Sequence, residues 1–180
     1  MDSQLVVGID VGGQTTKLGV VDARGTVLAQ TVIRTDTYST IEPYIAELAE
    51  AINKIIKDAD AEGKVRGIGV GAPNGNYYTG TIENAPNLPW GHNGVVEFAK
   101  LLSAAMNGLP VALTNDANAA AVGEMTYGAA RGMKNFIMIT LGTGVGSGIV
   151  INGEVVYGHD GFAGELGHTA AVRNNGRQCN

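Results

Sequence analysis

The stretch Val111–Ala121, VALTNDANAAA, joins a short apolar segment to a run rich in alanine. The apolar residues predict a strand and the alanines predict a helix. Asn115 and Asp116 stand at the junction, and in open α/β sheets ligands bind at this edge. An aspartate fixed there can take a proton from a substrate hydroxyl. Asp and Asn are also preferred helix N-caps, so a purely structural role stays open.

The rest of the hydrophobic pattern predicts an α/β fold. Three apolar runs joined by tight turns predict an antiparallel meander of strands. Apolar residues at three- and four-residue spacing then predict a long helix over 41–56. Alternating strands and helices follow, giving the order βββαβαβα of the ribonuclease-H-like fold, which actin-like ATPases and sugar kinases use in duplicate. The predicted elements are strands Leu5–Ile9, Leu18–Val21, Val27–Ile33, Val65–Val70 and Val111–Leu113, and helices Val95–Met106 and Ala117–Tyr127.

A weak internal repeat follows the last of these helices. Phe136–Leu141, a glycine-rich turn, Gly148–Asn152 and Val155–Val156 repeat the strand, glycine turn and strand of 5–21. We therefore predict a first lobe over residues 1–132. Residues 133–180 would form the truncated beginning of a second such domain.

Composition narrows the function class. The chain has 180 residues, a net charge of −5 and no basic run, which argues against nucleic acid as a partner. It has no apolar stretch of about 18 residues, and its start lacks the features of a signal peptide, so we expect no membrane span. The single cysteine, Cys179, excludes an internal disulfide and fits a cytoplasmic location.

Two glycine-rich stretches each follow the first predicted strand of a lobe: Asp10–Lys17, DVGGQTTK, and Leu141–Gly148, LGTGVGSG. Exposed backbone N–H groups and threonine hydroxyls suit phosphate, and Asp10 could hold Mg²⁺. The second stretch is not a Walker A loop, because it does not end in Gly-Lys-Ser/Thr. Each stretch alone could be an ordinary turn, since Gly and Asp dominate turns.

The segment Gly164–His168, GELGH, places Glu165 and His168 three residues apart. On a helix these two side chains would share a face and could hydrogen-bond sugar hydroxyls, although a surface turn is the alternative. Cys179 follows His168 by eleven residues and could be a metal ligand. A structural zinc site needs about four ligands, and this chain offers two, so a free thiol is favoured here.

Taken together, these four motifs resemble those of the ROK family, most closely its bacterial glucokinases. Asp10–Lys17 and Leu141–Gly148 are similar to the family's two phosphate motifs, and 115–120 to its catalytic motif. Gly164–His168 is similar to its Glu-x-Gly-His sugar motif. The resemblance runs through essentially the whole chain.

The resemblance implies ATP-dependent phosphorylation of a hexose, first of all glucose, at the 6-hydroxyl, with Asp116 as the base. It implies sugar binding by Asn115, Asp116, Glu165 and His168. It implies ATP binding by Asp10, Gly12, Gly13, Thr15, Gly142, Thr143 and Gly144. Asp10 would hold Mg²⁺, whereas His168 and Cys179 would be ligands of a structural Zn²⁺ that is complete in the full-length protein and absent here.

Two positions depart from the family pattern. Gln14 stands where the family usually has threonine after the glycine pair. Asn74 stands where the family has the last glycine of Gly-x-Pro-Gly, in the sequence GAPNG. The family's kinases are also longer, so we expect an N-terminal fragment that is inactive alone, and a homodimer for the parent protein.

Two alternatives remain. The first is a sugar-sensing ROK repressor without kinase activity. Such repressors carry a DNA-binding helix-turn-helix before the first strand, whereas here only Met1–Gln4 precede it, and the chain is acidic. The second is a kinase for another hexose, such as fructose, allose or an N-acetylhexosamine. The sequence favours a kinase but does not distinguish the sugars.

Overall fold

The computed structural model describes residues 4–142 and 144–170. By its contacts the chain divides into two compact units, Met1–Asp116 and Ala117–Asn180. The lobe boundary near Met133 stays a prediction. The contacts place nearly all of the helix α3 (Asp116–Tyr127) with the strands that follow it.

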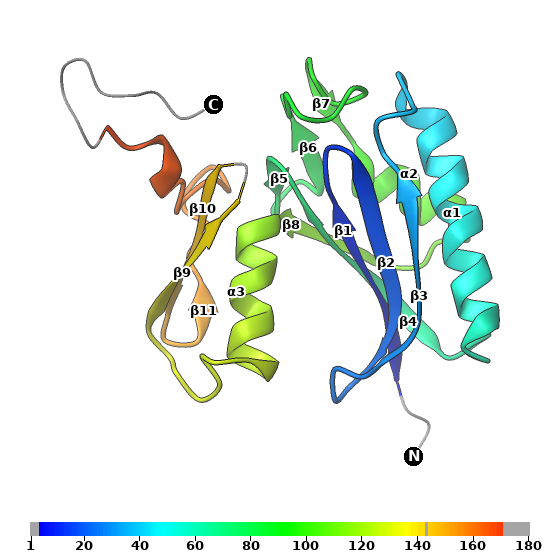
Figure 1. The fold of residues 1–180 in the computed structure, drawn as a ribbon, viewed down its shortest axis with the longest axis horizontal. Coiled ribbons are helices and arrows are strands. Elements are labelled where there is room, and N and C mark those ends of the chain that lie inside the picture. Colours follow the sequence, from blue (N-terminus) through cyan, green and yellow to red (C-terminus); the bar gives the residue numbers. More distant parts are fainter. Residues whose placement is uncertain (1–3, 143, 171–180) are drawn as a thin grey trace. The chain divides into compact units, whose positions relative to one another are not determined.

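The first unit is built on a five-stranded mixed sheet with the strand order β3-β2-β1-β4-β8 (Figure 1). The first three strands form the predicted antiparallel meander, and β1, β4 and β8 run parallel. The strands are β1 (Leu5–Val11), β2 (Thr15–Asp22), β3 (Val27–Arg34), β4 (Val65–Ala72) and β8 (Val111–Asn115). The predicted βββαβαβα order is therefore confirmed through β8 and α3.

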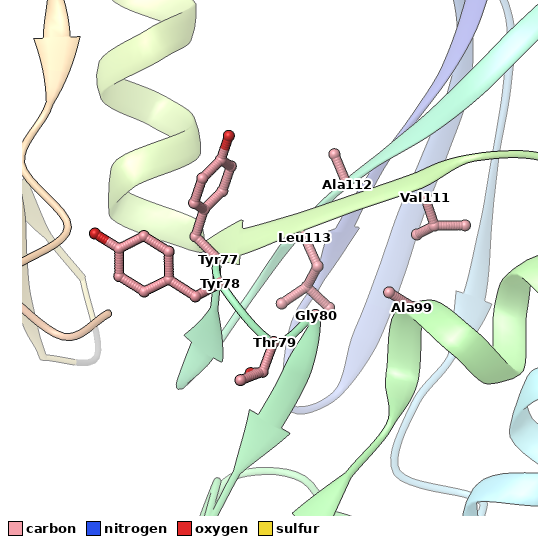
Figure 2. Close-up of a pocket in the computed structure, with 8 residues that line it drawn as sticks. All are labelled: Tyr77, Tyr78, Thr79, Gly80, Ala99, Val111, Ala112 and Leu113. Atoms are coloured by element: carbon pink, nitrogen blue, oxygen red, sulfur yellow. The ribbon is translucent and has the colours of Figure 1, made fainter. Parts of the chain in front are cut away.

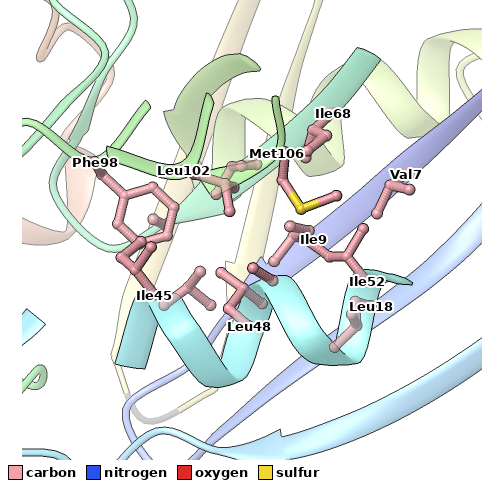
Figure 3. Close-up of a cluster of buried hydrophobic side chains, with 14 of the residues drawn as sticks. Val7, Ile9, Leu18, Ile45, Leu48, Ile52, Ile68, Phe98, Leu102 and Met106 are labelled. Carbon is pink, nitrogen blue, oxygen red and sulfur yellow. The ribbon is translucent and has the colours of Figure 1, made fainter. Parts of the chain in front are cut away.

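Helices α1 (Ile41–Asp58) and α2 (Phe98–Ala105) supply the apolar side chains that pack on this sheet. Figure 3 shows side chains of α1 and α2 meeting those of β1, β2 and β4 in one cluster. Alternate residues of β1 are buried, as a strand with one covered face requires. Trp90 stacks on Tyr44 at 4.8 Å and on Phe98 at 5.8 Å between ring centroids, so it packs its loop against α1 and α2.

A second, three-stranded sheet in the first unit has the order β5-β6-β7. It consists of β5 (Gly75–Asn76), β6 (Thr81–Glu83) and β7 (Val95–Val96). The predicted helix over Val95–Met106 is wrong at its start, because the two valines pair with Ile82 and Glu83 and the helix begins at Phe98. Strands of two or three residues are too short to show a hydrophobic period, so this sheet has no signal in the sequence.

The second unit holds α3 and an antiparallel sheet with the order β11-β10-β9. Its strands are β9 (Phe136–Leu141), β10 (Val145–Ile151) and β11 (Glu154–Val155), and a short 3-10 helix η1 (Leu166–His168) follows. These strands form an antiparallel meander like β1, β2 and β3, as the internal repeat predicts. Among the described residues, no helix is long and apolar enough to cross a membrane.

Candidate active site

The carboxyl ends of the three parallel strands bring two of the sequence motifs together. In the sheet register, Asp10 of β1 lies opposite Gly71 of β4, and Gly71 lies opposite Thr114 of β8. Neighbouring strands are about 4.8 Å apart, so Asp10 and Thr114 are separated by roughly 10 Å. Asn115 ends β8 and Asp116 begins α3. The predicted magnesium ligand and the predicted base therefore stand at one edge of one sheet.

Thr114 adds a feature to which sequence reasoning assigned no role. Its Oγ1 is buried and has no hydrogen-bond partner among the described residues. A buried hydroxyl without a partner is costly, so it marks a position where a donor or acceptor would be favourable. The sequence alone could not show that Thr114 lies level with Asp10, because that depends on the register of β1, β4 and β8.

The first glycine-rich turn joins β1 to β2. The Gly12 N–H donates to Thr15 O at 3.0 Å, and a Cβ on Gly12 would lie 2.8 Å from that same oxygen. A Cβ on Gly13 would lie 2.8 Å from Asn87 O. Real Cβ atoms do not approach backbone oxygens so closely, so the packing of this turn itself requires both glycines.

Gln14 is accommodated through its backbone. Its carbonyl oxygen accepts a hydrogen bond from Thr35 N at 2.9 Å, and its side chain is exposed. The next residues, Thr15 and Thr16, begin β2. A side-chain change at position 14 therefore leaves the hydrogen bonding of the turn intact.

Thr16 anchors this turn to α1. Its buried Oγ1 lies 2.6 Å from the Tyr44 hydroxyl and 2.8 Å from Thr35 Oγ1. Burial raises the pKa of Tyr44 to about 12, although the hydrogen bonds with the two threonines act in the opposite direction. The Tyr44 hydroxyl therefore stays protonated and can donate a hydrogen bond to Thr16 Oγ1.

The second glycine-rich turn joins β9 to β10 and is built differently. Gly142 and Gly144 are exposed, and a Cβ on either would meet no described atom within 4 Å. The turn is closed by Gly142 N donating to Gly144 O at 2.9 Å. Thr143 lies outside the described residues. The packing of the described residues therefore does not require glycine at either position.

Glu165 and His168 lie at the two ends of the η1 turn, and Glu165 Oε2 is 3.9 Å from His168 Nε2. The segment is a 3-10 turn rather than an α-helix, and in such a turn residues i and i+3 still lie on one side, so the two side chains are neighbours as expected. The Ser147 hydroxyl donates to Gly164 O and accepts from Leu166 N at 3.3 Å. These contacts fix the turn on its strand.

Two metals were predicted, Mg²⁺ at Asp10 and Zn²⁺ at His168 and Cys179. Mg²⁺ usually takes one or two carboxylates with waters and substrate phosphates, so the exposed Asp10 carboxylate at a strand end fits such a site. Cys179 lies outside the described residues. Within 4–142 and 144–170, no three His, Cys, Asp or Glu residues form a cluster that could hold a metal ion. The zinc site therefore stays a prediction.

Asn74 adopts a positive φ of 51°, a conformation that glycine and asparagine tolerate best. Its Nδ2 donates to Glu83 O at 2.9 Å and to Asn84 O at 3.0 Å. Asparagine thus keeps the left-handed turn that glycine would give, and adds hydrogen bonds across it. The departure from the family pattern is compatible with the same backbone path.

A pocket of about 460 Å³ is lined by the loop between β5 and β6, by α2 and by β8 (Figure 2). It contains none of the predicted site residues. It is lined by Tyr77, Tyr78, Thr79, Gly80, Ala99, Val111, Ala112 and Leu113.

Comparison with known proteins identifies the family of the chain. The ROK family model matches residues 6–180. The chain is 38% identical to a glucokinase of Halalkalibacterium halodurans, over all of this chain and 54% of that protein. It is 32% identical to a xylose repressor of Caldicellulosiruptor bescii, over 91% of this chain and 41% of the repressor. The chain spans about half the length of the curated relatives it matches.

Solved structures give the same result. A ROK family glucokinase from Streptomyces griseus, in complex with glucose and AMPPNP, aligns with a TM-score of 0.74 and 36% identity, over 93% of this chain and 51% of that one. A ROK hexokinase from Thermus thermophilus aligns with a TM-score of 0.80 and 36% identity, over 93% of this chain and 54% of that one. These neighbours have the actin-like ATPase fold. With its mixed sheet and its match to the family over residues 6–180, the chain belongs to the ROK family.

Proposed function

We propose that the protein transfers the γ-phosphoryl group of ATP to the 6-hydroxyl of a hexose, with glucose as the first candidate. The observation that carries this proposal is the placement of Asn115 and Asp116 at the carboxyl edge of the sheet. Asp10 lies at the same edge, level with Thr114. The similarity to the glucokinase of H. halodurans and to the S. griseus glucokinase bound to glucose and AMPPNP supports it.

Asp116 would act as the base. As the hydroxyl oxygen of the sugar bonds to the γ-phosphorus, the bond between that phosphorus and its bridging oxygen breaks, and ADP leaves. The hydroxyl proton passes to the Asp116 carboxylate. The transition state of phosphoryl transfer is loose, so positioning and charge stabilisation matter more than a strong base.

The other predicted residues would bind the two substrates. Asn115, Glu165 and His168 offer the mixture of donors and acceptors that sugar hydroxyls require. Gly142, Thr143 and Gly144 would bind the phosphates, because the space beside the two glycines is open. Gly12 would contribute through the shape of its turn, since its N–H already donates to Thr15 O. Gly13 and Thr15 would face the phosphates from that turn.

Asp10 would hold Mg²⁺, which neutralises charge on phosphate oxygens when it is bound. The zinc ligands His168 and Cys179, the homodimer and the cytoplasmic location are retained as predictions.

The test is a coupled assay of ADP formation by the complete protein against glucose, fructose, allose, mannose and N-acetylhexosamines, with ATP and Mg²⁺. We expect turnover that depends on sugar, with glucose giving the highest kcat/KM. ADP formation that does not depend on any sugar would contradict the proposal.

The second candidate is a sugar-responsive repressor, favoured by the match to the xylose repressor. The net charge of −5 argues against this chain itself binding DNA. Sugar-sensitive binding of the complete protein to a specific DNA site, together with no phosphorylation, would reverse the assignment.

A further inference from the structure

We propose that Glu83 is a positioning residue for Asn115 and Asp116 and acts through the hairpin of β5 and β6. This inference rests on the proposed function, because it assigns Glu83 a task in the same phosphoryl transfer. Glu83 itself lies at the end of β6 and is partly buried.

The Glu83 carboxylate ties together the two strands of the hairpin. Its Oε1 accepts from Asn76 Nδ2 at 3.0 Å and from Thr81 Oγ1 at 2.7 Å. Asn76 and Thr81 are both buried, with 6% and 7% of their surface exposed. Thr79 Oγ1 lies 2.5 Å from Thr81 Oγ1 and extends the network. A charged acceptor makes stronger hydrogen bonds than a neutral one, so this carboxylate fixes the hairpin firmly.

The backbone of Glu83 holds the preceding turn as well. Its N–H donates to Asn74 O at 3.1 Å, and its carbonyl oxygen accepts from Asn74 Nδ2 at 2.9 Å. One residue therefore connects the left-handed turn at Asn74 with both strands of the hairpin. Loss of the carboxylate would leave the side chains of Asn76 and Thr81 buried without this acceptor.

The hairpin rests directly on the end of β8. A Cβ on Gly75 would lie 2.5 Å from Thr114 O and 2.9 Å from Leu113 Cδ2, so only glycine lets the two backbones approach this closely. Figure 2 shows the Leu113 side chain pointing toward the segment Thr79–Gly80 of the same hairpin. Thr114 is followed at once by Asn115 and Asp116, so the hairpin contacts the backbone that carries both groups.

The position of that backbone matters because phosphoryl transfer depends on alignment. A displacement of about 1 Å at a reacting group can reduce turnover roughly a hundredfold. If the hairpin loosens, the end of β8 loses the contact at Gly75 and the Asp116 carboxylate gains freedom. The expected consequence is a lower kcat with little change in the KM for ATP.

The test compares Glu83→Ala, Glu83→Gln and Glu97→Ala in the complete protein. Glu97 is a matched control, because it is an exposed glutamate of the same unit whose carboxylate pairs with Lys100 on the surface. We expect Glu83→Ala to lower kcat about tenfold or more. Glu83→Gln should keep most of the wild-type kcat, because its amide oxygen can accept the same two hydrogen bonds. Glu97→Ala should leave kcat unchanged.

A double-mutant cycle with Asp116→Asn separates positioning from simple loss of folded enzyme. If Glu83 acts through Asp116, Glu83→Ala lowers kcat by about twofold or less in the Asp116→Asn background. An equal loss in both backgrounds, or wild-type kcat in Glu83→Ala, would overturn the inference. If Glu83→Ala does not fold, Thr81→Val takes its place, and wild-type kcat in that variant would overturn the inference too.

The proposed function is tested separately by the wild-type protein and Asp116→Asn. Sugar-dependent turnover that Asp116→Asn lowers about a hundredfold or more, with no effect at Glu83, would leave the function standing and remove only the role of Glu83. Absence of sugar-dependent turnover in the wild-type protein would overturn both.

Discussion

The turns β1–β2 and β9–β10 carry similar sequences, DVGGQTTK and LGTGVGSG, but their glycines meet different surroundings. In the first turn a Cβ on Gly12 or Gly13 would press against a backbone oxygen at 2.8 Å. In the second, a Cβ on Gly142 or Gly144 would meet no described atom within 4 Å. The same residue type is therefore required by packing in one turn and not in the other, where the proposed phosphate contact would be the reason for it.

The second motif also contains glycines of the packing kind. On Gly148 a Cβ would lie 2.8 Å from Ala121 Cβ and 3.0 Å from Ala117 O, both on α3. The helix approaches the strand closely because β10 has no side chain there. A glycine-rich motif is thus better understood residue by residue than as one phosphate loop.

Gly148→Ala is expected to lower the stability more than the substitutions considered in the following paragraphs. The added methyl group must displace α3, and overpacking of this kind costs about 1–3 kcal/mol. Thermal or urea denaturation of the complete protein measures the loss. Unchanged stability would mean that the contact of β10 with α3 is looser than the structure shows.

Gly13→Ala should follow, with a loss of about 1–2 kcal/mol, because the new methyl group meets Asn87 O. The same denaturation experiment applies. If Gly13→Ala kept full stability and only weakened ATP binding, the two turns would not differ in the way described.

Tyr44→Phe tests the anchor of the first turn. The variant removes the hydroxyl that lies 2.6 Å from Thr16 Oγ1, and we expect it to lower the free energy of unfolding by about 1 kcal/mol. Thr16 would keep its hydrogen bond with Thr35, so the loss should stay small. A stability equal to that of the wild-type protein would show that the network does not hold the turn.

Gly144→Ala should show the opposite pattern to Gly13→Ala. We expect the free energy of unfolding to change by less than about 0.5 kcal/mol, since the site is exposed. The KM for ATP should rise several-fold because the methyl group would occupy the proposed phosphate space. A stability loss with an unchanged KM would contradict the comparison.

The smallest effect concerns the Asp22 turn, also in the first unit. Hydrogen bonds from the backbone N–H groups of Thr26 and Arg24, with the Arg24 side chain, lower the pKa of Asp22 to about 2. A carboxylate whose pKa is lower in the folded protein stabilises the fold fully at pH values above its unfolded pKa, near 3.8. That contribution is lost as the pH falls toward about 2. The stability difference between wild type and Asp22→Asn should therefore shrink between pH 5 and pH 2.

Much of the fold could be predicted from hydrophobic periodicity. The meander, the long helix α1 and the strand-to-helix junction at Asn115 all carry clear local patterns. The small sheet of β5, β6 and β7 could not be predicted, because Gly75–Asn76 and Val95–Val96 are too short to show a period.

The candidate site was predictable in its residue types but not in its contacts. The sequence indicated Asp10 and Asp116, whereas their shared edge depends on the register of β1, β4 and β8. The difference between Gly13 and Gly144 depends on Asn87, which is distant from both in the sequence. Such long-range contacts leave no local pattern.

Turnover of Asp116→Asn in the complete protein tests the central claim most directly. Asparagine keeps the shape of the side chain and cannot take up the sugar proton, so we expect kcat to fall by about 10²–10⁴-fold, with the thermal stability nearly unchanged. A variant that folds normally and phosphorylates glucose at the wild-type rate would contradict the account.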